Sequence, residues 1–168
     1  MSDFATCLAW TLHNEDSQLT YEATPDIGGF AIAGINSHVW PASYAYIAGL
    51  PVTERAAAVS TFYRCKFWAP AMAKIVSNEV AKRLFDCAVN EGFETAVCIF
   101  QRAIADLSGI IDEDGKLGKG TVDRANLLDP DKLVRAFQNE RVTAYEKIVA
   151  EHPEKKDCLA GWLARARL

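Results

Sequence analysis

Two amphipathic segments separated by a single glycine constrain the fold of this chain more than any other feature. The first is expected to run from a cap at Ser77 to Gly92, a typical helix C-terminus, and the second from Phe93 to Leu107. Apolar residues recur at helical spacing in both: Val80, Ala81, Leu84, Phe85 and Ala88, then Ala96, Val97, Phe100, Ile104 and Leu107. Because the turn between them is so short, we expect a helical hairpin at the hydrophobic centre.

Further helical patterns flank this pair. We expect helices from Ser2 or Asp3 to about Asn14, from Thr53 to Phe67 or Trp68, from a cap at Thr121 to Asn126, from Asp129-Pro130 to about Glu151, and from Lys155 to Arg167. Residues 16–36 have no helical period, and their glycines favour turns and short strands. The predicted fold class is therefore mainly α (α+β), with a small β-like lobe near the N-terminus.

Composition narrows the class of protein. Of the 168 residues, 50% are hydrophobic and 24% charged, which is typical of a soluble globular protein with one main domain. The net charge of -4 provides no general attraction to nucleic acid or acidic membranes, although the excess of basic residues after Lys132 favours a locally basic face. No apolar run is long enough for a membrane span, and the N-terminus lacks the features of a secretory signal. We therefore expect synthesis in the cytoplasm without a Sec signal.

The five cysteines do not form a metal-binding or disulfide pattern. Cys7, Cys65, Cys87, Cys98 and Cys158 are scattered and include no CxxC pair. Four of them fall in apolar helical patterns, where a buried thiol behaves as a small hydrophobic group, so free structural thiols are expected. The acidic segment 112–115 lacks the later ligands of a calcium loop and is predicted to be a turn. We expect no metal and no cofactor.

The stretch from Asn14 to Ser37 carries the best candidate chemistry. Glu15 is expected at the end of the first helix and Asp26 beyond it, before a glycine-rich turn, with Glu22 as a third acid nearby. Glycoside hydrolysis uses one carboxylic acid to protonate the leaving oxygen and commonly a second carboxylate. The negative end of a helix and burial both disfavour a charged carboxyl, which would suit Glu15 as the acid. The other interpretation is an ordinary solvated acidic loop.

Motifs follow one another along the first part of the chain in this order: Glu15, Asp26-Ile27-Gly28-Gly29, Gly34-Ile35, Phe62-Tyr63-Arg64, Phe67-Trp68, Leu84-Phe85-Asp86, Ala88-Val89-Asn90 and Gly92. Taken in this order, they resemble the glycoside hydrolase family 108 muramidases. The continuation is similar to their C-terminal peptidoglycan-binding region, through Phe100-Gln101-Arg102-Ala103, Asp114-Gly115-Lys116-Leu117-Gly118, Thr121, Arg141, Tyr145, Gly161-Trp162 and Arg165. The resemblance implies a lysozyme-like catalytic region over 1–92 and a helical peptidoglycan-binding region over 93–168, packed as one compact unit.

The resemblance also implies roles for individual residues. Glu15 stands at the place of the family's catalytic glutamate, and Asp26 matches the aspartate that precedes its Gly-Gly pair. The sequence departs from the family at Asp16 and Ser17, where the family has two glycines, and at Ala31, where it has a threonine. A hydroxyl at position 31 would help hold a water or the second carboxylate, and Ala31 supplies none.

The function that the resemblance implies is a peptidoglycan muramidase. It would cleave the β-1,4 bond between N-acetylmuramic acid and N-acetylglucosamine, with Glu15 as general acid and Asp26 acting on the attacking water or stabilising the transition state. The expected contacts to substrate are Glu22, Gly28, Gly29, Tyr63, Trp68 and Asn90. The expected partner is the peptidoglycan glycan strand, with no nucleic acid and no membrane insertion, and the protein would be a monomer that acts in the periplasm or at the cell wall after export or lysis.

Three alternatives stay open at this stage. The departures at Asp16, Ser17 and Ala31 favour a catalytically impaired peptidoglycan-binding protein. A lytic transglycosylase using Glu15 alone would leave anhydromuramic ends instead of reducing ends. A helical interaction or structural module would bind no peptidoglycan at all.

Overall fold

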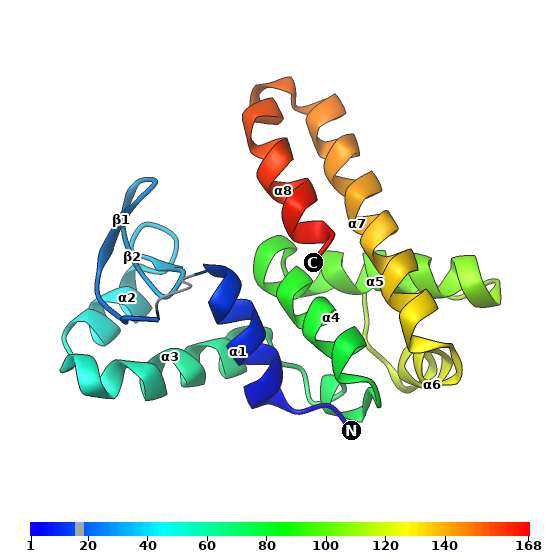
Figure 1. Ribbon diagram of the computed structural model, residues 1–168, viewed down its shortest axis with the longest axis horizontal. Coiled ribbons are helices and arrows are strands. Elements are labelled where there is room, and N and C mark those ends of the chain that lie inside the picture. Colours follow the sequence, from blue (N-terminus) through cyan, green and yellow to red (C-terminus); the bar gives the residue numbers. More distant parts are fainter. Residues whose placement is uncertain (16–18) are drawn as a thin grey trace. The chain divides into compact units, whose positions relative to one another are not determined.

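The computed structural model describes residues 1–15 and 19–168 and is mainly helical, with a small sheet near the N-terminus (Figure 1). This confirms the predicted fold class. The chain forms two compact units, one of residues Phe4–Trp68 and one of Met1–Asp3 with Ala69–Leu168. The predicted division into regions 1–92 and 93–168 stays a prediction. The departures noted at Asp16 and Ser17 lie outside the described residues.

The N-terminal unit, Phe4–Trp68, contains three helices and all the strands of the described residues. Its elements are α1 (Phe4–Glu15), β1 (Thr24–Asp26), β2 (Gly29–Ile32), β3 (Ile35–Asn36), α2 (Pro41–Ala48) and α3 (Val52–Phe67). The predicted ends of α1 and α3 agree with the structure to within one residue. Helix α2 was not predicted, although Pro41 at its first turn is a common helix-start signal.

The three strands form an antiparallel sheet in the order β1-β2-β3. Thr24 pairs with Ala31 and Asp26 with Gly29. Because alternate residues of a strand share a face and paired residues lie opposite each other, Thr24, Asp26 and Ala31 belong to one face of the sheet. The sheet therefore places the Thr24 hydroxyl and the Asp26 carboxylate on the same face.

The turn between β2 and β3 has an unusual backbone. Ala33 and Gly34 both have positive φ angles, of 47° and 78°, as a type I′ hairpin turn requires. Ala33 adopts this conformation at a cost of roughly 1–2 kcal/mol for a residue with a Cβ. The Tyr63 hydroxyl donates a hydrogen bond of 2.9 Å to the Ala33 carbonyl oxygen and so holds the turn in place from α3.

A hydrophobic core fixes these elements to one another. Helix α1 packs on α3, and α2 packs on β2 and β3. The buried side chains include Phe4, Cys7, Leu8, Leu12, Ile32, Ile35, Ile47, Val59, Phe62 and Tyr63. This packing supports the sheet and the end of α1, which carry the candidate carboxylates.

The second unit is all-helical. Its elements are η1 (Met72–Lys74), α4 (Asn78–Glu91), α5 (Phe93–Ser108), α6 (Lys119–Leu127), α7 (Pro130–Glu151), η2 (Pro153–Cys158) and α8 (Leu159–Ala166). Two of the predicted caps are confirmed: Ser77 Oγ accepts a hydrogen bond from the Val80 amide, and Asp129 Oδ1 accepts one from the Lys132 amide. Helix α5 packs against both α4 and α7, and Figure 1 shows α7 and α8 side by side.

Some predictions for this unit were wrong in detail. Thr121 does not cap α6, since the helix begins at Lys119, and the buried Thr121 hydroxyl instead accepts a hydrogen bond from Gln101. Leu107 is 39% exposed and does not join the core. The predicted last helix is divided into the 3-10 segment η2 and the short α8.

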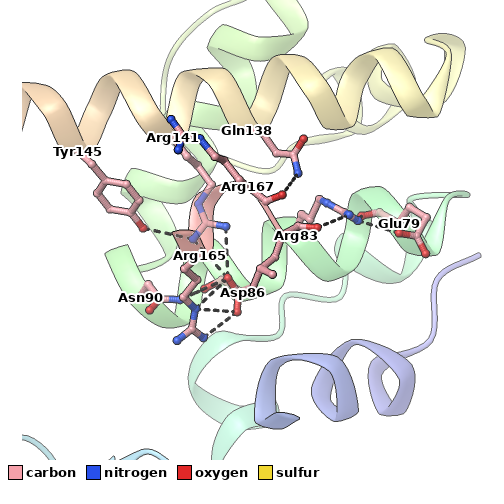
Figure 2. Close-up of polar contacts among 10 residues, drawn as sticks. Glu79, Arg83, Asp86, Asn90, Gln138, Arg141, Tyr145, Arg165 and Arg167 are labelled. Carbon is pink, nitrogen blue, oxygen red and sulfur yellow. Dashed lines mark hydrogen bonds and ion pairs between the residues drawn. The ribbon is translucent and has the colours of Figure 1, made fainter. Parts of the chain in front are cut away.

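A buried ionic cluster of Asp86, Arg141, Tyr145 and Arg165, here called the Asp86 cluster, joins α4, α7 and α8 (Figure 2). The Asp86 side chain is fully buried, and it accepts hydrogen bonds of 3.3 Å from Arg141 and 2.8 Å from Arg165. Burial raises the pKa of the Tyr145 hydroxyl far above its usual value. Arg141 and Arg165 therefore serve an internal ion pair and do not contribute to the basic face that was expected after Lys132.

All five cysteines are free, as predicted, but only Cys7 and Cys87 are buried. Cys98 is partly exposed, and Cys65 and Cys158 are exposed, so the expected burial of four thiols was wrong. Among the helices that the structure describes, none is long and apolar enough to cross a membrane.

Candidate active site

The candidate site is a cavity of about 290 Å³ in the N-terminal unit. Its lining residues come from the end of α1, from the sheet and from the β2–β3 turn: Glu15, Thr24, Pro25, Asp26, Ala31, Ala33 and Gly34. The fold thus brings Glu15 and Asp26 to one cavity, the arrangement that acid/base chemistry on a glycosidic bond requires. Their individual roles stay predictions.

Glu15 is the last residue of α1, and its carboxyl group lies against Gly34. A Cβ at position 34 would stand 3.2 Å from the Glu15 Oε2 atom and 2.8 Å from the Tyr63 hydroxyl. The absence of a side chain at Gly34 therefore makes room for the carboxyl group. The burial expected for Glu15 is not present, since its side chain is exposed.

Asp26 is held by two hydrogen bonds. Its Oδ2 atom accepts one of 2.8 Å from the Asn36 side-chain amide, and its Oδ1 atom accepts one of 2.7 Å from the Ile27 backbone amide. Asn36 is itself buried and fixed, because the same amide nitrogen donates to the Ile27 carbonyl and its Oδ1 atom accepts from the His38 backbone amide. These bonds hold the Asp26 carboxylate in one orientation among the residues that line the cavity.

Arg55 anchors the segment that leads into β1. Its guanidinium group donates to the backbone carbonyls of Leu50 and Ala48 at 3.0 and 2.9 Å, and to that of Tyr21 at 3.0 Å. Tyr21 has a positive φ of 54°, a conformation that a residue with a side chain adopts only when its surroundings impose it. Arg55, which lies in α3, therefore ties the segment before β1 to the end of α2.

The predicted substrate contacts lie outside the lining of this cavity. Glu22 is exposed on the segment before β1, Gly28 lies in the β1–β2 turn, and Gly29 pairs with Asp26. Tyr63 is buried behind Gly34, and Trp68 packs edge-on against Phe4 with ring centroids 5.4 Å apart. Asn90 lies in the other unit and donates a hydrogen bond of 2.7 Å to the Asp86 carbonyl oxygen. Direct contact of these six residues with substrate stays a prediction.

Sequence reasoning missed three residues that build the site. Thr24 lines the cavity, Asn36 orients Asp26, and Arg55 anchors the entry to β1. The spacing of Thr24 and Asp26 is a usable signal, because residues two apart in a strand share a face. Nothing local in the sequence marks Asn36 or Arg55, whose partners lie in other elements.

The helical unit contains a second polar cavity, of about 340 Å³. Lys116, Arg124 and Asp112 contribute side chains of both charges to its lining. The buried Gln101 organises the adjoining loop, donating to Asp114 Oδ1 at 2.8 Å and accepting from the Gly115 amide at 3.0 Å. Asp114 also accepts from the Lys116 amide, the geometry of the turn that was predicted here.

Comparison with known proteins gives two family models that cover most of the chain. The model described as Glycosyl hydrolase 108 matches residues 8–92, and the one described as Predicted Peptidoglycan domain matches residues 95–167. The solved structure of SagA from Brucella abortus is similar over 97% of this chain and 92% of that chain, with a TM-score of 0.63 and 20% identity. At that identity the likeness shows a shared fold. No curated protein sequence matches the chain.

Proposed function

Because the chain belongs to the glycosyl hydrolase 108 family, we propose that it cleaves the β-1,4 bond between N-acetylmuramic acid and N-acetylglucosamine in peptidoglycan. The family makes the chain a glycoside hydrolase of lysozyme type, and the adjoining peptidoglycan domain supports peptidoglycan as the substrate. The observation that carries the proposal is the cavity lined by both Glu15 and Asp26.

Glu15 is proposed as the general acid that protonates the glycosidic oxygen as the bond breaks. Its carboxyl group is exposed in the free protein, and a glycan strand in the cavity would cover it. Exclusion of water by the substrate strengthens the interaction between this carboxyl group and the leaving oxygen. Gly34 leaves the space in which the carboxyl group approaches the leaving oxygen.

Asp26 is proposed as the second carboxylate, which acts on the attacking water or stabilises the positive charge of an oxocarbenium-like transition state. The bonds from Asn36 and from the Ile27 amide support this role, because they hold the carboxylate in one orientation before substrate arrives. No step of this chemistry calls for a cofactor.

The C-terminal region, residues 93–168, is also proposed to bind peptidoglycan. The polar cavity beside Lys116 and Arg124 suits its charged peptide stems. We propose that the protein acts as a monomer at the cell wall.

The test is digestion of purified, insoluble peptidoglycan by the full chain and by Glu15→Gln. We expect the wild type to release reducing sugar ends and Glu15→Gln to lose about a hundredfold or more of that rate, the usual contribution of a general acid. Glu54→Gln, a change of an exposed glutamate on α3, is the matched control and should leave the rate unchanged. Full activity of Glu15→Gln would refute the assigned role.

A transglycosylase remains the second candidate, favoured by Ala31, which brings no hydroxyl to the cavity. Mass spectrometry of the products separates the two reactions, because a transglycosylase leaves 1,6-anhydromuramic ends. A protein that binds the wall and releases neither product would be the impaired binder.

A further inference from the structure

Thr24 is the one hydroxyl-bearing side chain among the described residues that line the cavity. It lies on β1 two residues before Asp26, so both side chains share a face of the sheet. Its Oγ1 atom donates a long hydrogen bond of 3.4 Å to the carbonyl oxygen of Ala31, its partner on β2. When the O–H is directed to this carbonyl oxygen, the lone pairs of the Thr24 oxygen stay available to a group inside the cavity.

Space for such a group exists beside Thr24. Side chains of directly paired residues lie about 4.5–5.5 Å apart at Cβ, and the partner here is only a methyl group. Each carboxylate oxygen of Asp26 already accepts one hydrogen bond, Oδ2 from Asn36 and Oδ1 from the Ile27 amide. Each of these oxygens has a second lone pair that can accept another hydrogen bond. A water between Thr24 and Asp26 would therefore find two acceptors.

We infer that Thr24 and Asp26 together hold the nucleophilic water of the proposed hydrolysis, an inference that rests on that proposed function. A water that donates one hydrogen to Thr24 Oγ1 and the other to the Asp26 carboxylate presents its own lone pair to the sugar. In the reaction the water oxygen bonds to the anomeric carbon while the glycosidic C–O bond breaks. The leaving oxygen takes the proton of Glu15, and the water proton passes to Asp26.

The test compares Thr24→Val, which keeps the shape and removes the hydroxyl, with Thr24→Ser, which keeps the hydroxyl. Release of reducing ends from peptidoglycan would be measured for kcat and KM. We expect Thr24→Val to lower kcat on the order of tenfold to a hundredfold with little change in KM, because a misplaced water slows the chemical step. Thr24→Ser should stay within about threefold of the wild type, since it can still accept the water hydrogen.

Controls separate this role from a structural one. Thr61→Val on α3 removes another hydroxyl that donates to a backbone carbonyl, at 2.9 Å, and should leave kcat unchanged. Melting curves should coincide, since Thr24 is exposed, and Thr24→Ala serves as a second hydroxyl-free variant that should match Thr24→Val in kcat.

The outcomes distinguish the inference from the proposed function. The role of Thr24 would be overturned if Thr24→Val kept the wild-type kcat, or if Thr24→Ser and Thr24→Val lost activity equally. In either case the muramidase proposal would still stand, provided that Glu15→Gln lost activity. A wild-type protein that releases no reducing ends would overturn both.

Discussion

Gly34 and Glu15 show how much of this site depends on the absence of a side chain. Gly34 has a φ of 78°, and a Cβ there would crowd both the Glu15 carboxyl and the Tyr63 hydroxyl. Gly34→Ala should therefore destabilise the β2–β3 turn by about 1 kcal/mol or more and displace Glu15, lowering the rate of peptidoglycan hydrolysis. Urea unfolding and the release of reducing ends measure the two effects.

The matched control is Gly161→Ala in α8. A Cβ at this position meets no neighbouring side chain within 4 Å, and alanine is the better helix former. We expect it to preserve activity and to keep or raise stability. If Gly34→Ala behaved like Gly161→Ala, the close approach of Glu15 to the turn would not matter for function.

Thiol reactivity tests the burial of single residues. Burial raises the pKa of the Cys87 thiol to about 12, so almost none of it is the reactive thiolate at pH 8. Iodoacetamide at pH 8 should modify the exposed Cys65 and Cys158 rapidly, and Cys7 and Cys87 only after denaturation. Peptide mass spectrometry at timed intervals gives the order, and rapid labelling of Cys87 in the folded protein would contradict its placement in the core.

At the scale of elements, local signals predicted most helix boundaries and few of the contacts. Ser77 and the Asp129-Pro130 pair mark the starts of α4 and α7 because caps act within one turn of the helix. Helix α2 was missed although Pro41 marks its start, and Thr121 was misassigned as a cap because its hydroxyl serves Gln101, far away in sequence.

The candidate site was likewise predicted only in part from the sequence. Glu15 and Asp26 were found from residue type, helix end and motif order, all readable along the chain. The parts that orient them were not, because the Thr24–Ala31 register and the reach of Asn36 to Asp26 depend on strand pairing. The expectation that Glu15 is buried failed for a related reason, since exposure at a helix end depends on elements elsewhere in the fold.

At the scale of the whole molecule, the boundary between the two matched regions falls inside the helical unit, Ala69–Leu168. The Glycosyl hydrolase 108 match ends at residue 92 and so includes α4, whose Asp86 pairs with Arg141 and Arg165 of the peptidoglycan-domain match. The buried ion pairs of Asp86 therefore join the end of the first matched region to the second. A fragment that ended at residue 92 would leave this carboxylate without its partners.

Substitution of Asp86 should test this linkage. Asp86→Ala leaves the buried Arg141 without its countercharge, and breaking a buried ion pair in this way costs about 3–5 kcal/mol. We expect a marked fall in the urea midpoint of unfolding. Asp123→Ala removes the exposed ion pair with Lys119 and should change that midpoint little. Equal midpoints for the two variants would show that the Asp86 cluster does not hold the helices together.

The most direct test of the central claim is product analysis of purified peptidoglycan digested by the wild type and by Glu15→Gln. The account predicts muropeptides with reducing N-acetylmuramic acid ends from the wild type and almost none from Glu15→Gln, with Glu54→Gln equal to the wild type. Anhydromuramic ends, reducing N-acetylglucosamine ends, or undiminished release by Glu15→Gln would contradict it.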